Sequence, residues 1–173
     1  MARNVEIKAR IGGIEALLPR ARALADGDAV RLLQDDTFFQ VPHGRLKLRE
    51  FGDGSAELIH YQRADTSEAR LSDYVRTPVS APASMRAALE RALGAAIGRV
   101  RKRRLLLLAG ATRIHLDDVQ HLGEFIELEV VLRDEQGEAD GARVAEQLMH
   151  ELGLAAAPRV AGAYLDLLAD PRR

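Results

Sequence analysis

The chain has 173 residues, with 25 basic and 26 acidic side chains and a formal net charge of −1. This balance excludes a protein whose whole surface is a footprint for nucleic acid or a membrane. The absence of cysteine excludes a disulfide framework and a thiolate metal site. Aromatic residues make up 4% and include no tryptophan, which does not favour a base-stacking platform.

The length fits one domain spanning residues 1–173. Residues 1–10 contain no apolar run of signal-peptide length, and the longest aliphatic run covers only residues 105–108. We therefore expect a soluble cytoplasmic protein without a membrane span.

The predicted elements are mostly short strands. Residues 4–11 alternate polar and apolar side chains with a period of two, which is typical of a strand that packs on one face. Gly12 and Gly13 end this strand, and residues 14–24 then predict a short helix. The same alternation and the intervening turn residues predict further strands at 30–41, 45–49, 56–63, 71–79, 99–109, 112–120 and 124–132. Later helices are predicted at 84–93, opened by Pro82, and at 141–152, before a helical or extended closing piece at 164–168.

The polar faces of these strands carry charged side chains sorted into pairs. The members of each pair are two or four positions apart, so both point to the same side of their strand. A solvated strand face explains any one pair taken alone. If the sheet closes into a barrel, several such pairs can all point inward, which weakens that explanation considerably. The pairs are Glu6 with Lys8, Lys47 with Arg49, Lys102 with Arg104, Arg113 with Asp117, and Glu127 with Glu129.

An interior lined by both signs of charge is costly unless the charges are paired or matched to an ion. Lys and Arg bind phosphate oxygens, and a carboxylate cluster holds Mg²⁺ or Mn²⁺. The sequence therefore predicts a site for a triphosphate with a divalent metal. Residues 99–104 also fit a nucleic-acid patch, but their direct continuation into residues 105–108 favours a strand. The histidines show no ligand spacing, so none is predicted to bind metal: His43, His60, His115, His121 and His150.

Several segments, taken in order, resemble the motifs of the CYTH superfamily, which groups class IV adenylyl cyclases with thiamine triphosphatases and bacterial inorganic triphosphatases. Residues 4–8 (NVEIK) resemble its E-x-E-x-K signature, with Asn4 in the place of the first Glu. Residues 44–49 (GRLKLR) and 100–104 (VRKRR) are similar to two basic strands of the family. Residues 114–129 resemble its most diagnostic stretch, L-D-x-V-x-x-L-G-x-F-x-E-L-E, and residues 163–168 (AYLDLL) resemble its closing S-Y-x-D-L-L.

The resemblance implies an α+β protein built as a closed eight-stranded antiparallel β-barrel, or tunnel, with flanking helices. The catalytic residues that it implies are Glu6, Lys8, Glu127 and Glu129. The metal, Mg²⁺ or Mn²⁺, is implied to bind Glu6, Asp117, Glu127 and Glu129. The implied phosphate-binding residues are Lys8, Lys47, Arg49, Arg63, Lys102, Arg104 and Arg113.

Two positions depart from the family pattern. Asn4 removes one acidic ligand, so we expect lower metal affinity or an altered or absent activity. Arg63 follows from a looser alignment of Tyr61-Gln62-Arg63, in which Gln62 stands in a place often held by Lys. This second departure is expected to remove one basic contact.

Three activities fit this pattern. A class IV adenylyl cyclase converts ATP to cyclic AMP and pyrophosphate, and a triphosphatase hydrolyses the terminal phosphate of inorganic or thiamine triphosphate with metal-activated water. A binding module, favoured by Asn4, holds a nucleotide or polyphosphate without turnover. The sequence identifies no base-recognition pocket and does not rank the first two. The expected partner is ATP, inorganic triphosphate or thiamine triphosphate, with no nucleic-acid or membrane partner, and a homodimer is left open.

Overall fold

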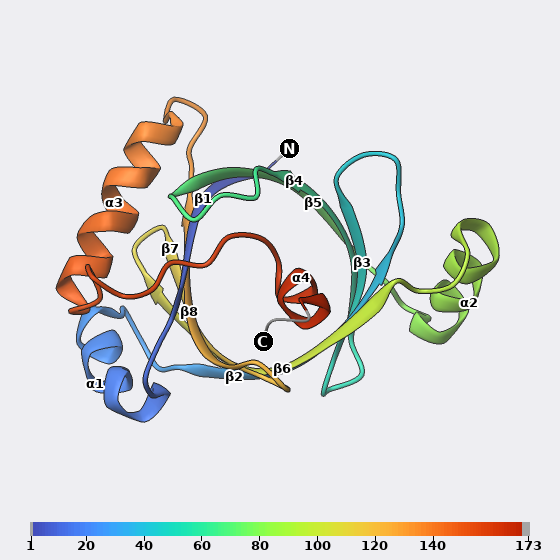
Figure 1. The fold of residues 1–173 in the computed structure, drawn as a ribbon, viewed down its shortest axis with the longest axis horizontal. Helices are drawn as coiled ribbons and strands as arrows, with labels where there is room; N and C mark the ends of the chain where they lie inside the picture. The colour runs from blue at the N-terminus through green and yellow to red at the C-terminus, as the bar shows by residue number, and fades with distance from the viewer. Residues whose placement is uncertain (1, 171–173) are drawn as a thin grey trace.

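The strands close into one barrel in the computed structural model, which describes residues 2–170. Going round the ring, the order is β1-β5-β4-β3-β2-β6-β7-β8, and every neighbouring pair is antiparallel (Figure 1). The pairing of β1 with β8 completes the ring, so the barrel has no free edge. The prediction of a closed antiparallel barrel with flanking helices is confirmed. The ends of the expected domain, residue 1 and residues 171–173, lie outside the described residues.

All predicted strands are present, with ends shifted by at most two residues. β2 ends ahead of Pro42, which has no N–H to donate to a ladder. β3 continues two residues further than predicted because Phe51 still pairs with Gln34 of β2. The strands are β1 (Ala2–Arg10), β2 (Val30–Phe39), β3 (Arg45–Phe51), β4 (Ala56–Arg63), β5 (Arg70–Pro78), β6 (Gly98–Ala109), β7 (Thr112–Val119) and β8 (Gly123–Val131).

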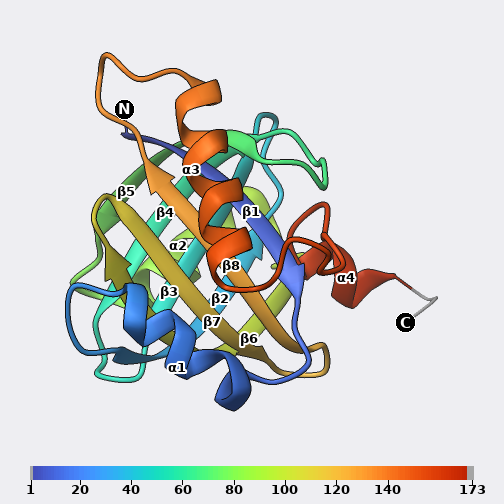
Figure 2. The same cartoon turned by 90° about the vertical axis from the view of Figure 1, so that its left-hand side faces the viewer.

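Three of the four described helices lie outside the ring of strands (Figure 1). α1 (Ile14–Leu24) and α3 (Glu138–Glu151) cover one side of the barrel, and α2 (Pro82–Leu93) lies on the opposite side (Figures 1 and 2). α3 begins three residues earlier than predicted because the Asp140 carboxylate accepts a hydrogen bond from the N–H of Gly137 at 3.0 Å, which caps the helix. Within residues 2–170, none of the helices has the length and apolar character needed to cross a membrane.

The apolar core lies between the barrel and its helices rather than inside the barrel. Ile126 and Leu128 of β8 point outward and pack beneath α1 and α3, together with Met149 of α3. α3 sits close because Gly141 faces β1: a Cβ there would meet the side chain of Val5 at 2.5 Å. A second cluster packs under α2. Since the outward faces of these strands are apolar, the inward faces are left for polar groups.

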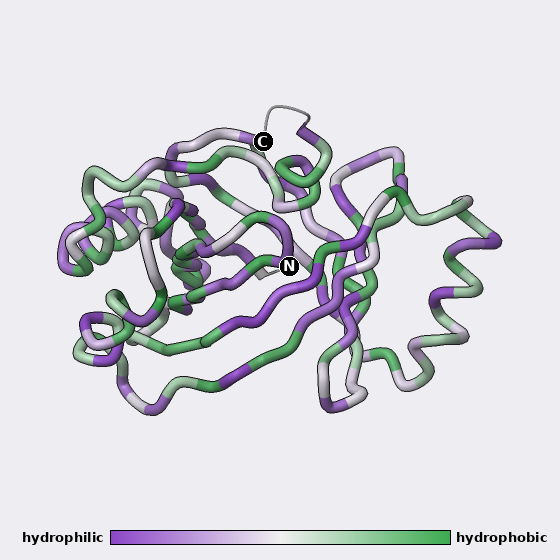
Figure 3. The backbone as a smooth tube through the Cα atoms, turned by 60° about the horizontal axis from the view of Figure 1, so that its bottom comes forward, coloured by the Kyte–Doolittle hydropathy of each residue, from purple (hydrophilic) through white to green (hydrophobic). Residues whose placement is uncertain are grey.

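One end of the barrel is closed by apolar side chains and by α4 (Tyr164–Ala169). Phe38, Val100, Val119 and Phe125 pack there around Tyr164, whose ring meets that of Phe125 edge-on at 5.0 Å. Figure 2 shows α4 beyond this end of the barrel, and the closing piece is thus helical. The colours of Figure 3 show that hydrophilic stretches run through the strands themselves. The polar interior therefore begins above an apolar floor.

Candidate active site inside the barrel

The barrel encloses a cavity of about 220 Å³ whose wall carries charges of both signs. Eight basic side chains line it: Lys8, Lys47, Arg49, Arg63, Arg76, Lys102, Arg104 and Arg113. Five acidic side chains share the wall: Glu6, Asp36, Glu57, Glu127 and Glu129. Positive charge is thus concentrated inside a chain whose net charge is −1. An enclosed cavity with such an excess concentrates its electric field on an anion that enters.

The structure brings all seven predicted phosphate-binding residues to this one cavity, together with three of the four predicted metal ligands, Glu6, Glu127 and Glu129. These residues occupy inward positions on six different strands. Gln62 is exposed between Tyr61 and Arg63, which do line the cavity. The expectation that Gln62 removes a basic contact was therefore wrong, because this position faces away from the cavity.

Asp36 of β2, which sequence reasoning missed, holds two predicted phosphate binders of β3. Its carboxylate accepts hydrogen bonds from Nζ of Lys47 at 2.9 Å and from Nε and Nη2 of Arg49, both at 2.7 Å. Asp36 is only 2% exposed. Burial by itself raises the pKa of this carboxyl, but the charges of Arg49 and Lys47 outweigh that effect and hold the pKa well below its ordinary value. Asp36 is therefore ionised and orients both cations.

Asp117, the fourth predicted metal ligand, is not among the residues that line the cavity. Its carboxylate accepts Nε and Nη2 of Arg104, both at 2.6 Å, and the hydroxyl of Tyr164 at 2.9 Å. Nζ of Lys102 lies 3.8 Å away. Both oxygens of this fully buried carboxylate are thus occupied. Its contacts make Asp117 an anchor for the basic residues of β6.

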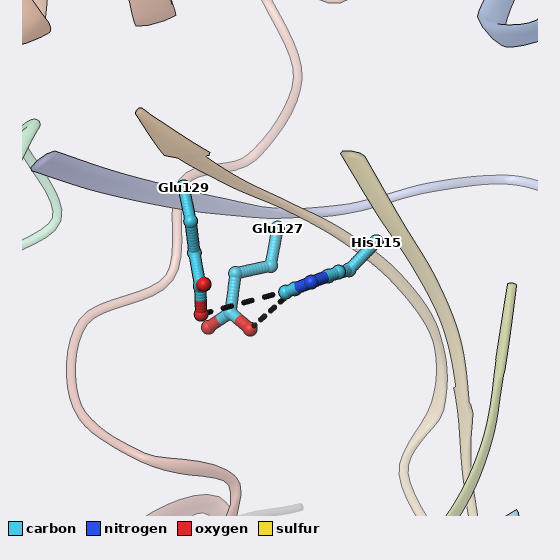
Figure 4. Close-up of side chains that lie close together, drawn as sticks. All are labelled: His115, Glu127 and Glu129. Atoms are coloured by element: carbon cyan, nitrogen blue, oxygen red, sulfur yellow. Dashed lines mark hydrogen bonds and ion pairs between the residues drawn. The ribbon is translucent and has the colours of Figure 1, made fainter. Parts of the chain in front are cut away.

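Glu127 and Glu129 of β8 converge with His115 of β7 (Figure 4). Nδ1 of His115 lies 3.4 Å from Oε2 of Glu127 and 3.9 Å from Oε1 of Glu129. Glu127 also pairs with Lys8 at 3.3 Å and with Arg104 at 3.0 Å. Burial raises the pKa of Glu127, but Lys8 and the hydrogen bond from His115 outweigh it and hold the pKa well below its ordinary value. Burial and the charge of Arg104 lower the pKa of His115, so its imidazole is neutral near pH 7.

No histidine was predicted as a metal ligand, yet His115 lies with the two glutamates. One signal was available in the sequence. His115 is two residues from both Arg113 and Asp117, and therefore shares their inward face. Helical ligand spacing does not apply to this segment, because side chains two positions apart share a face on a strand.

In the first strand, Glu6 and Asn4 make different contacts inside the cavity. Glu6 forms an ion pair with Arg63 and accepts a hydrogen bond from Nε of Arg70 at 3.1 Å. Arg70, which sequence reasoning did not single out, is 1% exposed. Asn4 also lines the cavity, and its buried Oδ1 has no hydrogen-bond partner among residues 2–170. Glu6 is thus engaged by two guanidinium groups, while Asn4 keeps a free acceptor.

Lys102 is the cavity cation whose pKa is lowered closest to neutral pH. It is buried, and its carboxylate neighbour, Asp117, is already bound by Arg104. Burial and the charge of Arg104 lower the pKa of Lys102 to about 7, against the opposing effect of Asp117. Lys102 is consequently poised to take up a proton when an anion arrives.

The segment before α4 orients further cations. The carbonyl of Gly162 accepts Nη2 of Arg63 at 3.0 Å and Nζ of Lys8 at 3.4 Å. Nζ of Lys8 also lies 4.1 Å from the ring centroid of Tyr164, close enough for a cation–π contact. The C-terminal segment therefore supplies part of the site as well as its floor.

The fold and the site together define a tunnel barrel with a charged interior. The family model for the CYTH domain matches residues 2–164, and the chain belongs to the CYTH family. A search of curated proteins found no match.

Solved structures share this fold at low sequence identity. PH1012 from Pyrococcus horikoshii OT3 has a TM-score of 0.84 at 20% identity, covering 95% of this chain and 98% of that one. A protein from Vibrio parahaemolyticus, provisionally assigned as an adenylate cyclase, has a TM-score of 0.76 at 22% identity, covering 96% and 98%. HpAC1 from Hippeastrum, an adenylyl cyclase candidate described as having a dominant triphosphatase activity, has 0.65 at 17%, covering 92% and 91%. These structures share the tunnel fold, and membership of the CYTH family supports a triphosphate-binding tunnel enzyme.

Proposed function

We propose that this protein is a divalent-metal-dependent triphosphatase that holds the triphosphate chain of its substrate inside the barrel. The observation that carries the proposal is the excess of basic over acidic side chains in an enclosed cavity. Cations in a low-dielectric interior are costly unless they are matched by negative charge. A triphosphate supplies that charge and offers oxygens to which guanidinium groups bind in pairs.

The size of the cavity favours the triphosphate chain over a whole nucleotide. Its volume of about 220 Å³ lies below the roughly 300–1,000 Å³ of pockets that enclose drug-sized ligands. A nucleoside would remain largely outside. This supports hydrolysis at the terminal phosphorus of inorganic triphosphate over a reaction that needs a positioned ribose hydroxyl.

The basic residues of the cavity bind the triphosphate by exchanging their carboxylate partners for phosphate oxygens. In the free protein, Lys47 and Arg49 are held by Asp36, and Arg104 is held by Asp117 and Glu127. Phosphate oxygens take over these donors, so the triphosphate competes with the carboxylates that hold the basic side chains in the free protein.

Glu127 and Glu129 fit a divalent cation, because their carboxylate oxygens converge in one place. They would hold the metal, which when bound activates water and neutralises phosphate charge. Glu6 and Asp117, the other two expected ligands, are each held by guanidinium groups. We assign these two carboxylates to the positioning of basic side chains.

The proposed step is a hydrolysis. A water oxygen bonds to the terminal phosphorus, and the bond from that phosphorus to the bridging oxygen breaks. Orthophosphate and pyrophosphate leave, and one proton passes to solvent. Lys8 and Arg104, which flank Glu127, stabilise the negative charge on the oxygens of the transferred group.

One feature favours a second candidate, adenylyl cyclase. The barrel end remote from α4 has an apolar lip formed by Val30, Leu32, Leu106 and Leu108. Val30 is 53% exposed and Leu108 is 52% exposed. Such a surface can hold the base of ATP at the mouth while the phosphates lie inside.

Product analysis separates the candidates. We would incubate the protein with inorganic triphosphate, ATP or thiamine triphosphate, each with Mg²⁺ and with Mn²⁺, and follow products by ³¹P NMR and chromatography. The proposal expects orthophosphate and pyrophosphate from inorganic triphosphate. Cyclic AMP from ATP supports the second candidate, and binding without any turnover supports a binding module.

A matched pair of arginines controls this experiment. Arg49→Gln removes a cavity cation, whereas Arg101→Gln removes an exposed one that pairs with Asp35 on the outer face of the barrel. The first change is expected to reduce turnover by at least a hundredfold and the second to leave it unchanged. Equal effects of the two would contradict a site inside the barrel.

A further inference from the structure

The group formed by His115, Glu127 and Glu129 is more than a set of carboxylates. One ligand atom from each residue lies within 4.8 Å of the other two. His115 and Glu127 are direct cross-strand partners in the register of β7 and β8. The imidazole is buried and its Nδ1 faces both carboxylates (Figure 4). Nitrogen and oxygen donors thus meet on one wall of the cavity.

The separations lie within the range spanned by the ligands of a single ion. Bonds of about 2.1 Å to nitrogen or oxygen place neighbouring ligands of an octahedral ion about 3.0 Å apart and opposite ones about 4.2 Å apart. The two distances from Nδ1, 3.4 and 3.9 Å, lie between these limits. Only small side-chain rotations would separate this arrangement from coordination.

The first strand offers this group a neutral amide rather than a free carboxylate. At position 4 the chain has an amide, and Glu6 is engaged by Arg63 and Arg70. Glu6 is the register partner of Glu129, and Asn4 lies one inward position further along β1. Asn4 is 3% exposed and lines the same cavity, and its Oδ1 has no hydrogen-bond partner within the described part of the chain. A free neutral acceptor therefore borders the group that contains the imidazole.

We infer that His115 is a metal ligand and that this chain binds its cation through a mixed nitrogen and oxygen site of His115, Glu127 and Glu129, with the Asn4 amide at its border. The inference rests on the proposed function, whose metal it specifies. Imidazole suits first-row transition ions, whereas Mg²⁺ prefers oxygen ligands and water. The site therefore selects Mn²⁺ over Mg²⁺.

Metal and triphosphate are coupled in this site. In the free protein, Lys8 and Arg104 hold Glu127, and Arg113 holds Glu129 at 3.0 Å. A triphosphate draws these cations to its own oxygens and frees the carboxylates for the metal. Because coupling between two bound ligands is reciprocal, the metal and the triphosphate each raise the affinity of the protein for the other by the same factor. Mn²⁺ alone is expected to bind at least tenfold more weakly than Mn²⁺ with a non-hydrolysable triphosphate analogue.

Pulsed EPR of bound Mn²⁺ tests the nitrogen ligand directly. The wild-type protein, with Mn²⁺ alone and with Mn²⁺ plus a methylene-bridged triphosphate, is expected to show ¹⁴N modulation from an imidazole. His115→Gln should lose this modulation and bind Mn²⁺ at least tenfold more weakly, with little change in Mg²⁺ affinity by calorimetry. His150→Gln, at an exposed position on α3, is the matched control and should keep both properties.

The possible outcomes are distinct. Bound Mn²⁺ without nitrogen modulation in the wild-type protein overturns the inference, even if the analogue binds and the proposed function stands. Nitrogen modulation with Mn²⁺ but no binding of the analogue supports the metal site and overturns the proposed function. Since the wild-type spectrum is decisive by itself, an unstable His115→Gln protein does not weaken the test. A variant that folds and keeps its Mn²⁺ affinity and modulation also overturns the inference.

Discussion

Asp36→Asn should change stability and ligand affinity in opposite directions. The substitution keeps the size of the side chain but removes the charge that balances Lys47 and Arg49. Asp36 is almost fully buried, and three short hydrogen bonds, at 2.9, 2.7 and 2.7 Å, converge on it. The variant therefore places two unbalanced cations in the cavity wall of the free protein. Those same cations are proposed to bind phosphate.

The expected loss of stability follows from the burial of the ion pairs that Asp36 forms. Removing one partner of a buried ion pair costs about 3–5 kcal/mol. We expect about 3 kcal/mol, because the side chains of Lys47 and Arg49 keep 14% and 11% exposure to the cavity and its water. Triphosphate no longer competes with a carboxylate, so its affinity should rise at least tenfold, or about 1.4 kcal/mol. Ligand at a hundred times its Kd then restores about 2.7 kcal/mol of stability.

The assay is urea unfolding at pH 7 with and without inorganic triphosphate, beside calorimetry for affinity. The lowered pKa of Asp36 in the folded state means that its contribution is present above the unfolded pKa of about 3.9 and is lost as the pH falls. The difference between wild type and variant should accordingly shrink below pH 4. Asp35→Asn is the control: Asp35 pairs with exposed Arg99 and Arg101 on the outer face, so a loss below about 1 kcal/mol and unchanged affinity are expected. A loss below 1 kcal/mol for Asp36→Asn, or weaker triphosphate binding, would refute the reasoning.

Three further predictions follow from other parts of the molecule. Glu129→Gln should abolish metal-dependent turnover but change the metal-free stability by less than about 1 kcal/mol, because its partner Arg113 is 26% exposed. Thermal melting without metal and turnover with metal, on one purified variant, measure both effects. A large loss of stability would contradict this prediction. Because the pKa of Lys102 is about 7 and triphosphate favours its charged form, triphosphate binding should take up a proton near pH 8 and weaken as the pH rises. Calorimetry in buffers of different ionisation enthalpy detects this uptake. Identical binding heats in all buffers would argue against it. Gly141→Ala should lower the free energy of unfolding by about 1–3 kcal/mol, because the added methyl group pushes α3 away from β1, yet leave triphosphate affinity unchanged. Urea unfolding measures the first effect and calorimetry the second. A change in affinity would show that the helix influences the site.

The inward and outward faces of the strands were predictable from the sequence because a strand alternates with a period of two. In β8, Glu127 and Glu129 alternate with Ile126 and Leu128, and the structure sends the first pair to the cavity and the second beneath the helices. This pattern identified the charged faces. The closed eight-stranded ring came from the resemblance to a family, because periodicity does not determine which strands are neighbours.

The ion pairs inside the barrel could not be predicted in this way. Asp36 meets Arg49 because β2 and β3 pair in one register, and a shift of a single residue would send Asp36 to the other face. Arg70 lies just outside the strand predicted at 71–79, yet register brings it to Glu6 of β1. Spacing within a strand carries no information about register between strands. The partners of the candidate site residues therefore required the structure.

Calorimetry of inorganic triphosphate against orthophosphate, in the presence of Mn²⁺, tests the central claim most directly. A cavity whose basic side chains come from six strands should bind one triphosphate per chain at least a hundredfold more tightly than orthophosphate, because a single phosphate reaches few of these cations. Arg49→Gln should remove most of this difference, and Arg101→Gln should leave it intact. Equal affinity for the two anions, or a preference that survives Arg49→Gln unchanged, would contradict a triphosphate site inside the barrel.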